Sequence, residues 1–430
     1  MLFLSQAAKD HFPRDSQAWY ARVAVILLIA VTAASFHVCL DNGFVAWDDG
    51  VHLSEDAIQS TTVPTERLRW IFATAHGAGY DPLFRMANWL QLTLFGWDAR
   101  PFHLVSVLLH GANVLLSFVV VRRLGFGQTT ALVAALLFAV HPTRAEAVAW
   151  FSAQKHLECA LFALLGLVVY SPILTGARAR PRLLGTWLLF SVAGLFQSIA
   201  VAFPVLLVVL DLAYGRPLVR SVLEKAPFWL VSGLLAGAKL LAAAGYVEPV
   251  ERSFAAHYAT TVQLPFLYLS RAIWPLEYNA RFFVTPQAGF FALTPALHLL
   301  LLVAVAFAFG LLVKRVSRRY ALLLLGWPVA CMLPVLNLVP VPTVTISDRF
   351  LYLALLGPFA VAAHLWTQKG RVLAPLTATI LILLPLVLGG ALLSHTHAKA
   401  FRSTTALWEA SFAAQPQNPV TRYYLAAAML

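Results

Sequence analysis

The sequence has little charge for its length: only 12% of its 430 residues are Asp, Glu, Lys or Arg, whereas 60% are hydrophobic. Soluble globular domains are about one-quarter charged, so this composition excludes a water-soluble globule. Cysteine is also scarce, since the chain has only Cys39, Cys159 and Cys331 and no CxxC pair. An odd number of cysteines, all in apolar segments, predicts neither a disulfide framework nor a zinc site.

What the chain has instead is a series of apolar runs, which recur from Ala21 to Leu393. Their length, near 20 residues, is the length of a membrane-spanning helix, and continuous runs exclude the alternating strands of an outer-membrane barrel. We therefore expect an all-α, polytopic membrane protein with about eleven transmembrane helices. The expected spans are residues 21–40, 102–121, 129–147, 157–172, 183–198, 200–213, 227–245, 295–313, 320–338, 350–366 and 372–393.

The segment from Leu183 to Ala213 decides whether the number of spans is odd or even. It is apolar for longer than one span requires, so it forms either one tilted helix or two short ones. Gln197, Ser198 and Pro204 interrupt it near the middle, which favours a tight reversal between two helices. Eleven spans then place the two ends of the chain on opposite sides of the membrane.

The net charge of +12 is distributed unevenly over these spans. With the N-terminus in the cytoplasm, the cytoplasmic segments hold 17 of the 31 lysines and arginines but only four of the 19 acidic residues. This is the positive-inside rule, and it explains the charge without a nucleic-acid partner. We expect a chain embedded in a lipid bilayer, the bacterial inner membrane or the ER membrane in a eukaryote, with a periplasmic or lumenal C-terminus.

Two large loops fall on the non-cytoplasmic side, where we expect the functional residues. In the first, Pro64 to Thr74 and Pro82 to Phe95 are too short to span and each has an apolar face, so they predict interfacial helices along the membrane surface. In the second, Tyr246 to Thr294, QLPFLYLSRAIW predicts another interfacial or re-entrant helix. The alternative is that these helices only cover the bundle.

The motif FVAWDDGVH follows the first span and holds Asp48, Asp49 and His52. Adjacent aspartates in a loop are usually a solvated turn. At the rim of an apolar cavity, however, desolvation raises the pKa of a carboxylate towards that of a useful general base. These three residues would also suit magnesium or manganese, but we expect no metal requirement.

A second polar segment, FAVHPTRAEAVAWFSAQKHLE, crowds His141, Arg144, Glu146, Lys155 and His156 into one short outer loop. The plain interpretation is capping of two helices, with Arg144 and Glu146 as an ion pair. The functional interpretation is a second wall of a polar site that faces the first loop.

The third polar segment, TVTISDRFLYLAL, places Asp348 and Arg349 at the outer start of the tenth expected span. Basic residues at a membrane rim are often only anchors. A guanidinium also matches the oxygens of a lipid phosphate, so Arg349 is a candidate ligand-binding residue.

Taken in order, FVAWDD, GWDARPFHLVSVLLHGANVLL, FAVHPTRAEAVAWFSAQKHLE, FQSIAVAFPVLLVVLD and SDRFLYLAL resemble the transmembrane and tetratricopeptide-repeat O-mannosyltransferases and their bacterial relatives. The resemblance covers roughly residues 44–393. It implies a glycosyltransferase fold of the C-superfamily in residues 1–393, with a polyprenyl-phosphate sugar donor and an active site on the outer face. Residues 394–430 are similar to the start of a tetratricopeptide-repeat region.

The resemblance implies roles for individual residues. Asp48 would be the general base and Asp49 its partner or an acceptor-positioning group, although which aspartate takes which role stays open. His141 and Glu146 match the His-Pro and acidic positions of the relatives' second outer loop, and Arg349 matches the basic position that follows the aspartate near the tenth span. From the residues themselves, Arg349 and Lys155 are the candidates to bind the donor phosphate, and the substrate-binding candidates are His52, His141, Arg144, Glu146 and Asp348.

The chain departs from these relatives at two places near the expected phosphate site. Gln154-Lys155-His156 stands where relatives have Arg-Lys-Asp, and Phe196-Gln197 stands where they have Ser-Lys. Both departures remove charged side chains, so they put the donor-binding residues in question.

The function that we expect is transfer of mannose or a similar hexose to an acceptor hydroxyl of a protein Ser or Thr, or of a glycan. Direct displacement of the lipid phosphate would invert the sugar and needs no cofactor. A transporter or flippase of lipid-linked sugars is one alternative, although the chain has no inverted repeat. A catalytically silent membrane scaffold is the other.

Overall fold

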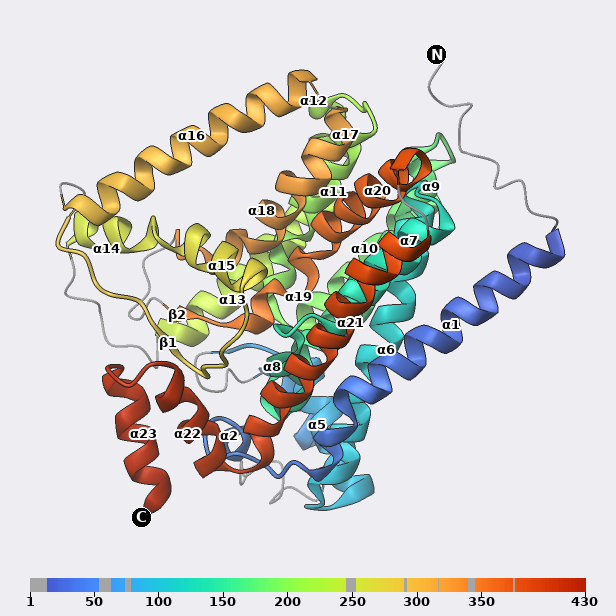
Figure 1. The fold of residues 1–430 in the computed structure, drawn as a ribbon. Helices are drawn as coiled ribbons and strands as arrows, with labels where there is room; N and C mark the ends of the chain where they lie inside the picture. The colour runs from blue at the N-terminus through green and yellow to red at the C-terminus, as the bar shows by residue number, and fades with distance from the viewer. Residues whose placement is uncertain are drawn as a thin grey trace.

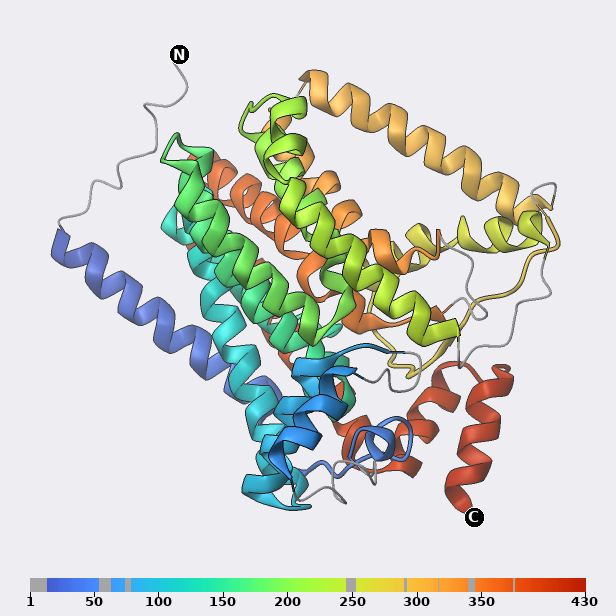
Figure 2. The same cartoon turned by 180° about the vertical axis from the view of Figure 1, so that it is seen from behind.

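The computed structural model describes residues 14–53, 63–73, 79–244, 253–289, 292–315, 317–338, 345–373 and 376–430, which are almost entirely helical (Figures 1 and 2). Short helices are labelled η. Up to residue 244 the elements are α1 (Arg14–Phe36), η1 (His37–Asp41), α2 (Asp49–Leu53), α4 (Pro64–Ala73), α5 (Pro82–Phe95), α6 (Ala99–Arg123), α7 (Gln128–Val140), α8 (Arg144–Ala149), η2 (Phe151–Ala153), α9 (Gln154–Leu174), α10 (Ala179–Phe196), η3 (Ser198–Ala202), α11 (Phe203–Ala213), α12 (Leu218–Glu224) and α13 (Ala226–Ala244).

The second half adds more helices and one two-stranded antiparallel sheet, in which Phe282 pairs with Ile346. Its elements are α14 (Phe254–Thr261), α15 (Leu264–Ile273), β1 (Phe282–Phe283), α16 (Leu293–Arg315), α17 (Arg318–Ala321), η4 (Leu322–Gly326), α18 (Trp327–Met332), η5 (Leu333–Val335), β2 (Thr345–Ile346), η6 (Asp348–Phe350), α19 (Leu351–Ala354), α20 (Leu356–Leu373), α21 (Leu376–Lys399), η7 (Ala400–Arg402), α22 (Thr404–Ala414) and α23 (Pro419–Met429).

The long helices form a slanted bundle. In it α6 packs against α7 and α9, α9 packs against α10, and α1 and α21 pack beside α6 and α7. Helices α2, α5, α8, α22 and α23 gather at the lower end in both views, whereas α1 begins higher up and runs down towards them (Figures 1 and 2). The start of α1 and the C-terminal helices therefore lie at different levels of the bundle, and an odd number of crossings stays a prediction.

Six of the described helices are long and apolar enough to cross a membrane: 18–41, 99–123, 151–174, 226–243, 293–311 and 381–402. The bent pair Asp348–Ala354 and Leu356–Thr367 gives a seventh. The expected span 183–198 lies in α10, which is unbroken but less apolar than these helices. The remaining expected spans are also helical but are shorter or broken into pieces. One reason is Pro142, which favours extended backbone at His141, so α7 ends at Val140 rather than near residue 147. The polytopic, all-helical class is thus as expected, while the figure of eleven full-length spans is not established.

The chain does reverse between α10 and α11. The rings of Phe190 and Phe203 stack with their centroids 5.7 Å apart, whereas one straight helix would separate these residues by about 20 Å. At the far end of α11 the Tyr170 hydroxyl donates to Asp211 Oδ1 at 2.6 Å, which brings α11 back beside α9. The reversal predicted from Gln197, Ser198 and Pro204 is therefore confirmed.

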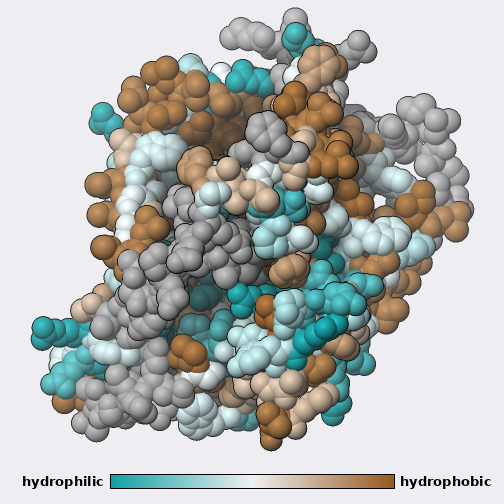
Figure 3. All heavy atoms as spheres, turned by 90° about the vertical axis from the view of Figure 1, so that its left-hand side faces the viewer, coloured by the Kyte–Doolittle hydropathy of each residue, from teal (hydrophilic) through white to brown (hydrophobic). Residues whose placement is uncertain are grey.

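The short helices expected in the outer loops are also present. Helix α5 has the predicted bounds and ends at Gly96, whose φ of +60° is favourable for glycine. Its Leu90 and Leu94 side chains are exposed, which suits contact with lipid. On the face shown in Figure 3, hydrophobic residues gather in the upper part and hydrophilic residues are more frequent below. The interfacial position of α4, α5 and α15 stays a prediction.

The last two helices form a pair that packs on the lower end of the bundle. The rings of Trp408 and Tyr424 stack at 4.4 Å and hold α22 against α23. Ser411 accepts a hydrogen bond from the backbone of Ala280 at 3.0 Å, which fixes α22 against the loop that leads to β1. The expected domain boundary at residue 393 lies inside α21, which continues to Lys399. The assignment of residues 394–430 to a tetratricopeptide repeat stays a prediction.

Candidate active site

Asp49 joins the first outer loop to the segment before α9. Its Oδ2 accepts a hydrogen bond from the backbone of Val45 at 2.8 Å. Its Oδ1 accepts from both the backbone and the hydroxyl of Ser152, at 3.1 and 2.5 Å. With 1% of its surface exposed and both oxygens engaged, Asp49 holds the loop in place and has little freedom to react with a substrate.

Asp48 precedes this anchor and is only half-buried. Trp47 on its other side stacks on Trp150, with centroids 4.3 Å apart and planes at 6°, and meets the edge of Trp408 at 5.4 Å. Anchored by a carboxylate on one side and an aromatic stack on the other, Asp48 has a defined position at the lower end of the bundle. Of the two adjacent aspartates, it is the more exposed one.

Arg349 and Glu146 form an ion pair that the sequence did not predict. The Arg349 guanidinium contacts Glu146 Oε1, and the Arg349 backbone donates to Oε2 at 3.0 Å. Burial raises the pKa of Glu146, and the positive charge of Arg349 opposes that shift. Arg349 Cζ also lies 5.0 Å from the centroid of Trp150, so the guanidinium touches the aromatic stack that positions Asp48.

Arg144 is therefore not the partner of Glu146, which corrects the ion pair considered from the sequence. Its Nε donates to the Phe138 carbonyl and its Nη1 to the Leu351 carbonyl, both at 3.1 Å. His141 donates from Nε2 to the Ala272 carbonyl at 3.0 Å. Both side chains tie separate segments of backbone together, and nothing in their contacts supports the substrate-binding role suggested for them.

Asp348 pairs with Arg271, an arginine to which the sequence analysis assigned no role. Arg271 on α15 binds it through two bonds, Nε to Oδ1 at 2.9 Å and Nη2 to Oδ2 at 2.7 Å. Arg271 also donates to the Glu277 carbonyl at 2.7 Å. This two-pronged pair fixes the start of η6, and so it orients Arg349 rather than offering Asp348 to a substrate. The arginine within QLPFLYLSRAIW was the only sequence signal for it.

Lys155 lies at the start of α9 and faces the first outer loop. Its Nζ is 3.1 Å from Asp81 Oδ2 and 5.5 Å from the centroid of Phe84 on α5. The ring of His52 meets the same Phe84 at 5.2 Å. The structure thus brings Lys155 and His52 to one wall, and it adds Asp81, which sequence reasoning missed because it precedes a helix like any ordinary N-cap residue.

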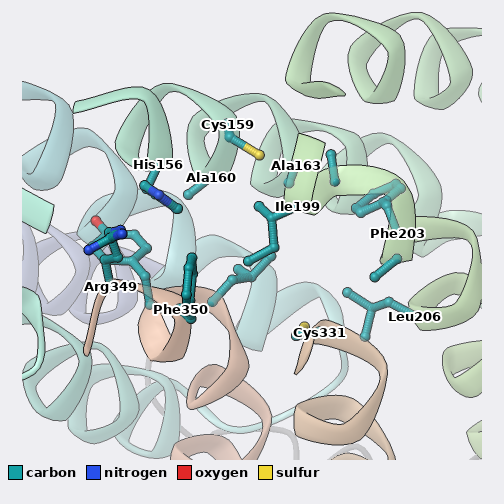
Figure 4. A pocket seen from close by; sticks show the side chains of 14 residues that line it. His156, Cys159, Ala160, Ala163, Ile199, Phe203, Leu206, Cys331, Arg349 and Phe350 are labelled. Atoms are coloured by element: carbon teal, nitrogen blue, oxygen red, sulfur yellow. The ribbon is translucent and has the colours of Figure 1, made fainter. Parts of the chain in front are cut away.

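A cleft of about 520 Å³, with the open space at its edge included, has Arg349 and His156 at its polar end, which we call its mouth (Figure 4). His156 and Arg349 lie together at one end, while Phe203 and Leu206 lie at the other. Apart from His156, Arg349 and Tyr352, the residues that line the cleft are apolar. They consist of Cys159, Ala160, Ala163, Ile199, Ala200, Ala202, Phe203, Leu206, Cys331, Phe350 and Leu353.

The shape and chemistry of this cleft suit an amphiphile. Its apolar interior would bury a hydrocarbon chain, at about 0.8 kcal/mol for each CH₂ group taken from water. Its mouth presents a guanidinium, which binds phosphate oxygens well. Elements far apart in the sequence build it, namely α9, η3, α11, α18, η6 and α19.

A metal site from Asp48, Asp49 and His52 finds no support in these contacts. Both oxygens of Asp49 already accept hydrogen bonds from Val45 and Ser152. Over the described part of the chain, no three His, Cys, Asp or Glu side chains come together as metal ligands. That the reaction needs no metal stays a prediction.

No family model matches the chain. In sequence it is similar to protein O-mannosyl-transferases: 39% identical over 114 residues to TMTC4 of Homo sapiens, covering 23% of this chain and 15% of that protein. It is 30% identical over 153 residues to TMTC3 of Mus musculus, covering 34% and 16%. A protein O-mannosyl-transferase of Caenorhabditis elegans is 23% identical over 171 residues, covering 37% and 25%. The resemblance predicted from the motifs is therefore confirmed, over at most a quarter of the length of these relatives.

Among solved structures, the chain resembles the oligosaccharyltransferase of the archaeon Archaeoglobus fulgidus tethered with an acceptor peptide. The TM-score is 0.49 and the identity 14%, over 95% of this chain and 59% of that one. A second structure, the oligosaccharyltransferase AglB of the same organism in complex with an inhibitory peptide and a dolichol-phosphate, gives 0.49 and 13%, over 96% and 60%.

Proposed function

We propose that the chain is a membrane glycosyltransferase that moves a sugar, mannose or a similar hexose, from a polyprenyl-phosphate donor to an acceptor hydroxyl. The observation that carries the proposal is the cleft, whose apolar interior has Arg349 at its polar end. The similarity to protein O-mannosyl-transferases supports a protein Ser or Thr as the acceptor. Trp47, the neighbour of Asp48, stacks on Trp150, and the Arg349 guanidinium lies 5.0 Å from the same ring, which supports Asp48 as a base that acts on that hydroxyl near the cleft.

In the proposed reaction, Asp48 takes the proton of the acceptor hydroxyl as its oxygen attacks the anomeric carbon. The bond from that carbon to the phosphate oxygen breaks, and the lipid phosphate leaves with the bonding pair of electrons. Arg349 and Lys155 stabilise the negative charge that grows on the leaving phosphate. A single displacement of this kind inverts the configuration of the sugar, and Asp49 keeps the base in position.

Transfer of a radiolabelled sugar from the lipid donor tests the proposal directly. Sealed vesicles that contain the protein should transfer radiolabelled sugar from a polyprenyl-phosphate donor to an acceptor peptide rich in Ser and Thr. If the lower end of the bundle faces the outside of the cell, peptide added to right-side-out vesicles should be labelled and peptide added to inverted vesicles should not. Movement of intact donor across the membrane without transfer would favour a flippase. The absence of both activities would favour a catalytically silent scaffold.

The pH dependence should report on Asp49. Burial raises the pKa of Asp49 from 3.8 to about 6, although hydrogen bonds from Ser152 and Val45 oppose that shift. The anchor is a carboxylate above that pH and becomes protonated below it, so the transfer rate should fall as the pH is lowered through about 6. Ser152→Ala removes a bond that stabilises the anion, and it should move the acidic limb of the pH–rate profile to higher pH. An unchanged limb in Ser152→Ala would show that another group sets it.

A further inference from the structure

Helix α13 runs alongside α10 in the same direction, and three contacts fix which of its faces points to the cleft. The rings of Phe190 and Phe228 stack at 5.7 Å near the start. Further along, Leu235 packs so closely on Gly194 that a Cβ atom at Gly194 would overlap its Cδ1. Between them the Ser232 hydroxyl donates to the Val201 carbonyl in η3 at 3.0 Å. The face that carries residues 228, 232 and 235 therefore packs on α10 and η3.

Lys239 is the next residue on that face, one turn after Leu235. Because α13 and α10 run in parallel, it reaches the level of Gln197, just beyond Gly194. The Gln197 amide contacts His156 Nε2 at 3.2 Å, and His156 lines the cleft mouth. The Lys239 side chain is half-buried. It lies within electrostatic range of the Asp81 carboxylate and of three groups at the cleft, Lys155, His156 and Arg349.

The other charges around the mouth are already paired. Arg349 is bound by Glu146, and Lys155 is bound by Asp81. The Gln197 amide donates to the ring nitrogen of His156, a bond that only a neutral imidazole accepts. Among the residues that the structure describes, Lys239 has no hydrogen-bond or ion-pair partner. Asp81, the carboxylate within electrostatic range of Lys239, is already bound by Lys155, so Arg349, Lys155 and Lys239 face only two carboxylates and one positive charge is in excess.

We propose that Lys239 is a third phosphate-binding cation, which completes the donor site from α13. The inference rests on the proposed function, because it names a further residue of the same site. A half-buried cation with no partner, beside an apolar cleft, is suited to an anionic headgroup whose hydrocarbon chain fills that cleft. One unmatched positive charge also balances the single negative charge of a sugar phosphodiester. When the sugar leaves, the phosphate gains a second negative charge, so Lys239 should stabilise product and transition state more than bound donor.

Binding measurements test this without requiring transfer. The affinity of the purified protein in nanodiscs should be measured for a short polyprenyl monophosphate and for the matching polyprenol, with inorganic phosphate as a third ligand. The affinity for polyprenyl monophosphate relative to that for polyprenol should drop about tenfold or more in Lys239→Met, while the affinity for polyprenol stays unchanged. Inorganic phosphate alone should bind weakly to all variants. Lys314→Met, an exposed lysine on α16, is the matched control and should keep the full phosphate-dependent affinity.

A compensating variant separates charge from structure. Gln197→Lys in the Lys239→Met background puts an ammonium back at the same level of the mouth, and it should restore much of the phosphate-dependent affinity. Full phosphate-dependent affinity in Lys239→Met would overturn the assignment. So would a loss that extends equally to polyprenol and that Gln197→Lys does not repair. If the wild-type protein binds polyprenyl phosphate through Lys239 but transfers no sugar, the inference stands and the proposed function fails.

Discussion

Asp48→Asn is expected to lower sugar transfer at least about a hundredfold and to leave the fold intact. The substitution keeps the size of the side chain and removes only its capacity to accept a proton. Asp48 is half-buried, and Trp47 and Asp49 hold the loop on either side of it, so the backbone should not move. Initial rates of label transfer, with thermal unfolding of the same preparations, measure both effects.

Two controls make the result specific. Asp41→Asn changes an exposed aspartate at the same end of the bundle, and it should leave the rate unchanged. Asp49→Asn should behave differently from Asp48→Asn, because an amide has one acceptor oxygen, so its NH₂ group loses either the bond from Val45 or the bonds from Ser152. It should lower the unfolding temperature as well as the rate. Normal transfer by Asp48→Asn and by the double Asn variant would remove the carboxylates from the mechanism.

This contrast would also settle a question that the motif alone left open. In FVAWDDGVH the two aspartates are equivalent, since a sequence of neighbours does not say which one is buried. The structure separates them by contacts that cross about a hundred residues of chain: Asp49 meets Ser152, and Trp47 meets Trp150. The motif supplies the two candidate carboxylates, and tertiary packing distinguishes their surroundings.

Local signals in the sequence were sufficient for several elements. Proline at the start and glycine at the end predicted α5 with its correct bounds, because both residues act on the backbone nearby. The polar break at Gln197 predicted the reversal before α11 for the same reason. Span lengths were less predictable, because hydropathy does not show that Pro142 ends α7 early or that the segment after Ser317 is broken into short helical pieces.

Partners across the bundle were not predictable. Glu146 has a nearby arginine in its own loop, yet it pairs with Arg349, which is 203 residues away along the chain. Lys239 lies within an apolar span and looks there like a tolerated charge. The position that we propose for it beside the cleft depends on Gly194, which lets α13 approach α10, and the sequence of α13 alone does not contain that information.

Arg349→Gln is expected to raise the KM for the donor and to lower kcat, by roughly tenfold to a hundredfold in kcat/KM. Its guanidinium lies at the cleft mouth, where the phosphate gains charge as the sugar leaves. Arg349→Lys should restore only part of the activity, since an ammonium cannot contact Glu146 and two phosphate oxygens with the same fork geometry. Initial rates against donor concentration separate the two parameters, and Arg100→Gln, an exposed arginine at the start of α6, should match wild type.

The ion pair with Glu146 requires one more variant, because Arg349→Gln alone leaves a buried carboxylate without its partner and should destabilise the protein. Arg349→Gln combined with Glu146→Gln removes both charges, so the unfolding temperature should recover while the donor kinetics stay impaired. If activity recovers together with stability, Arg349 serves only to pair with Glu146, and the phosphate must be bound by Lys155 and Lys239 alone. If stability returns and transfer does not, the guanidinium acts on the donor itself.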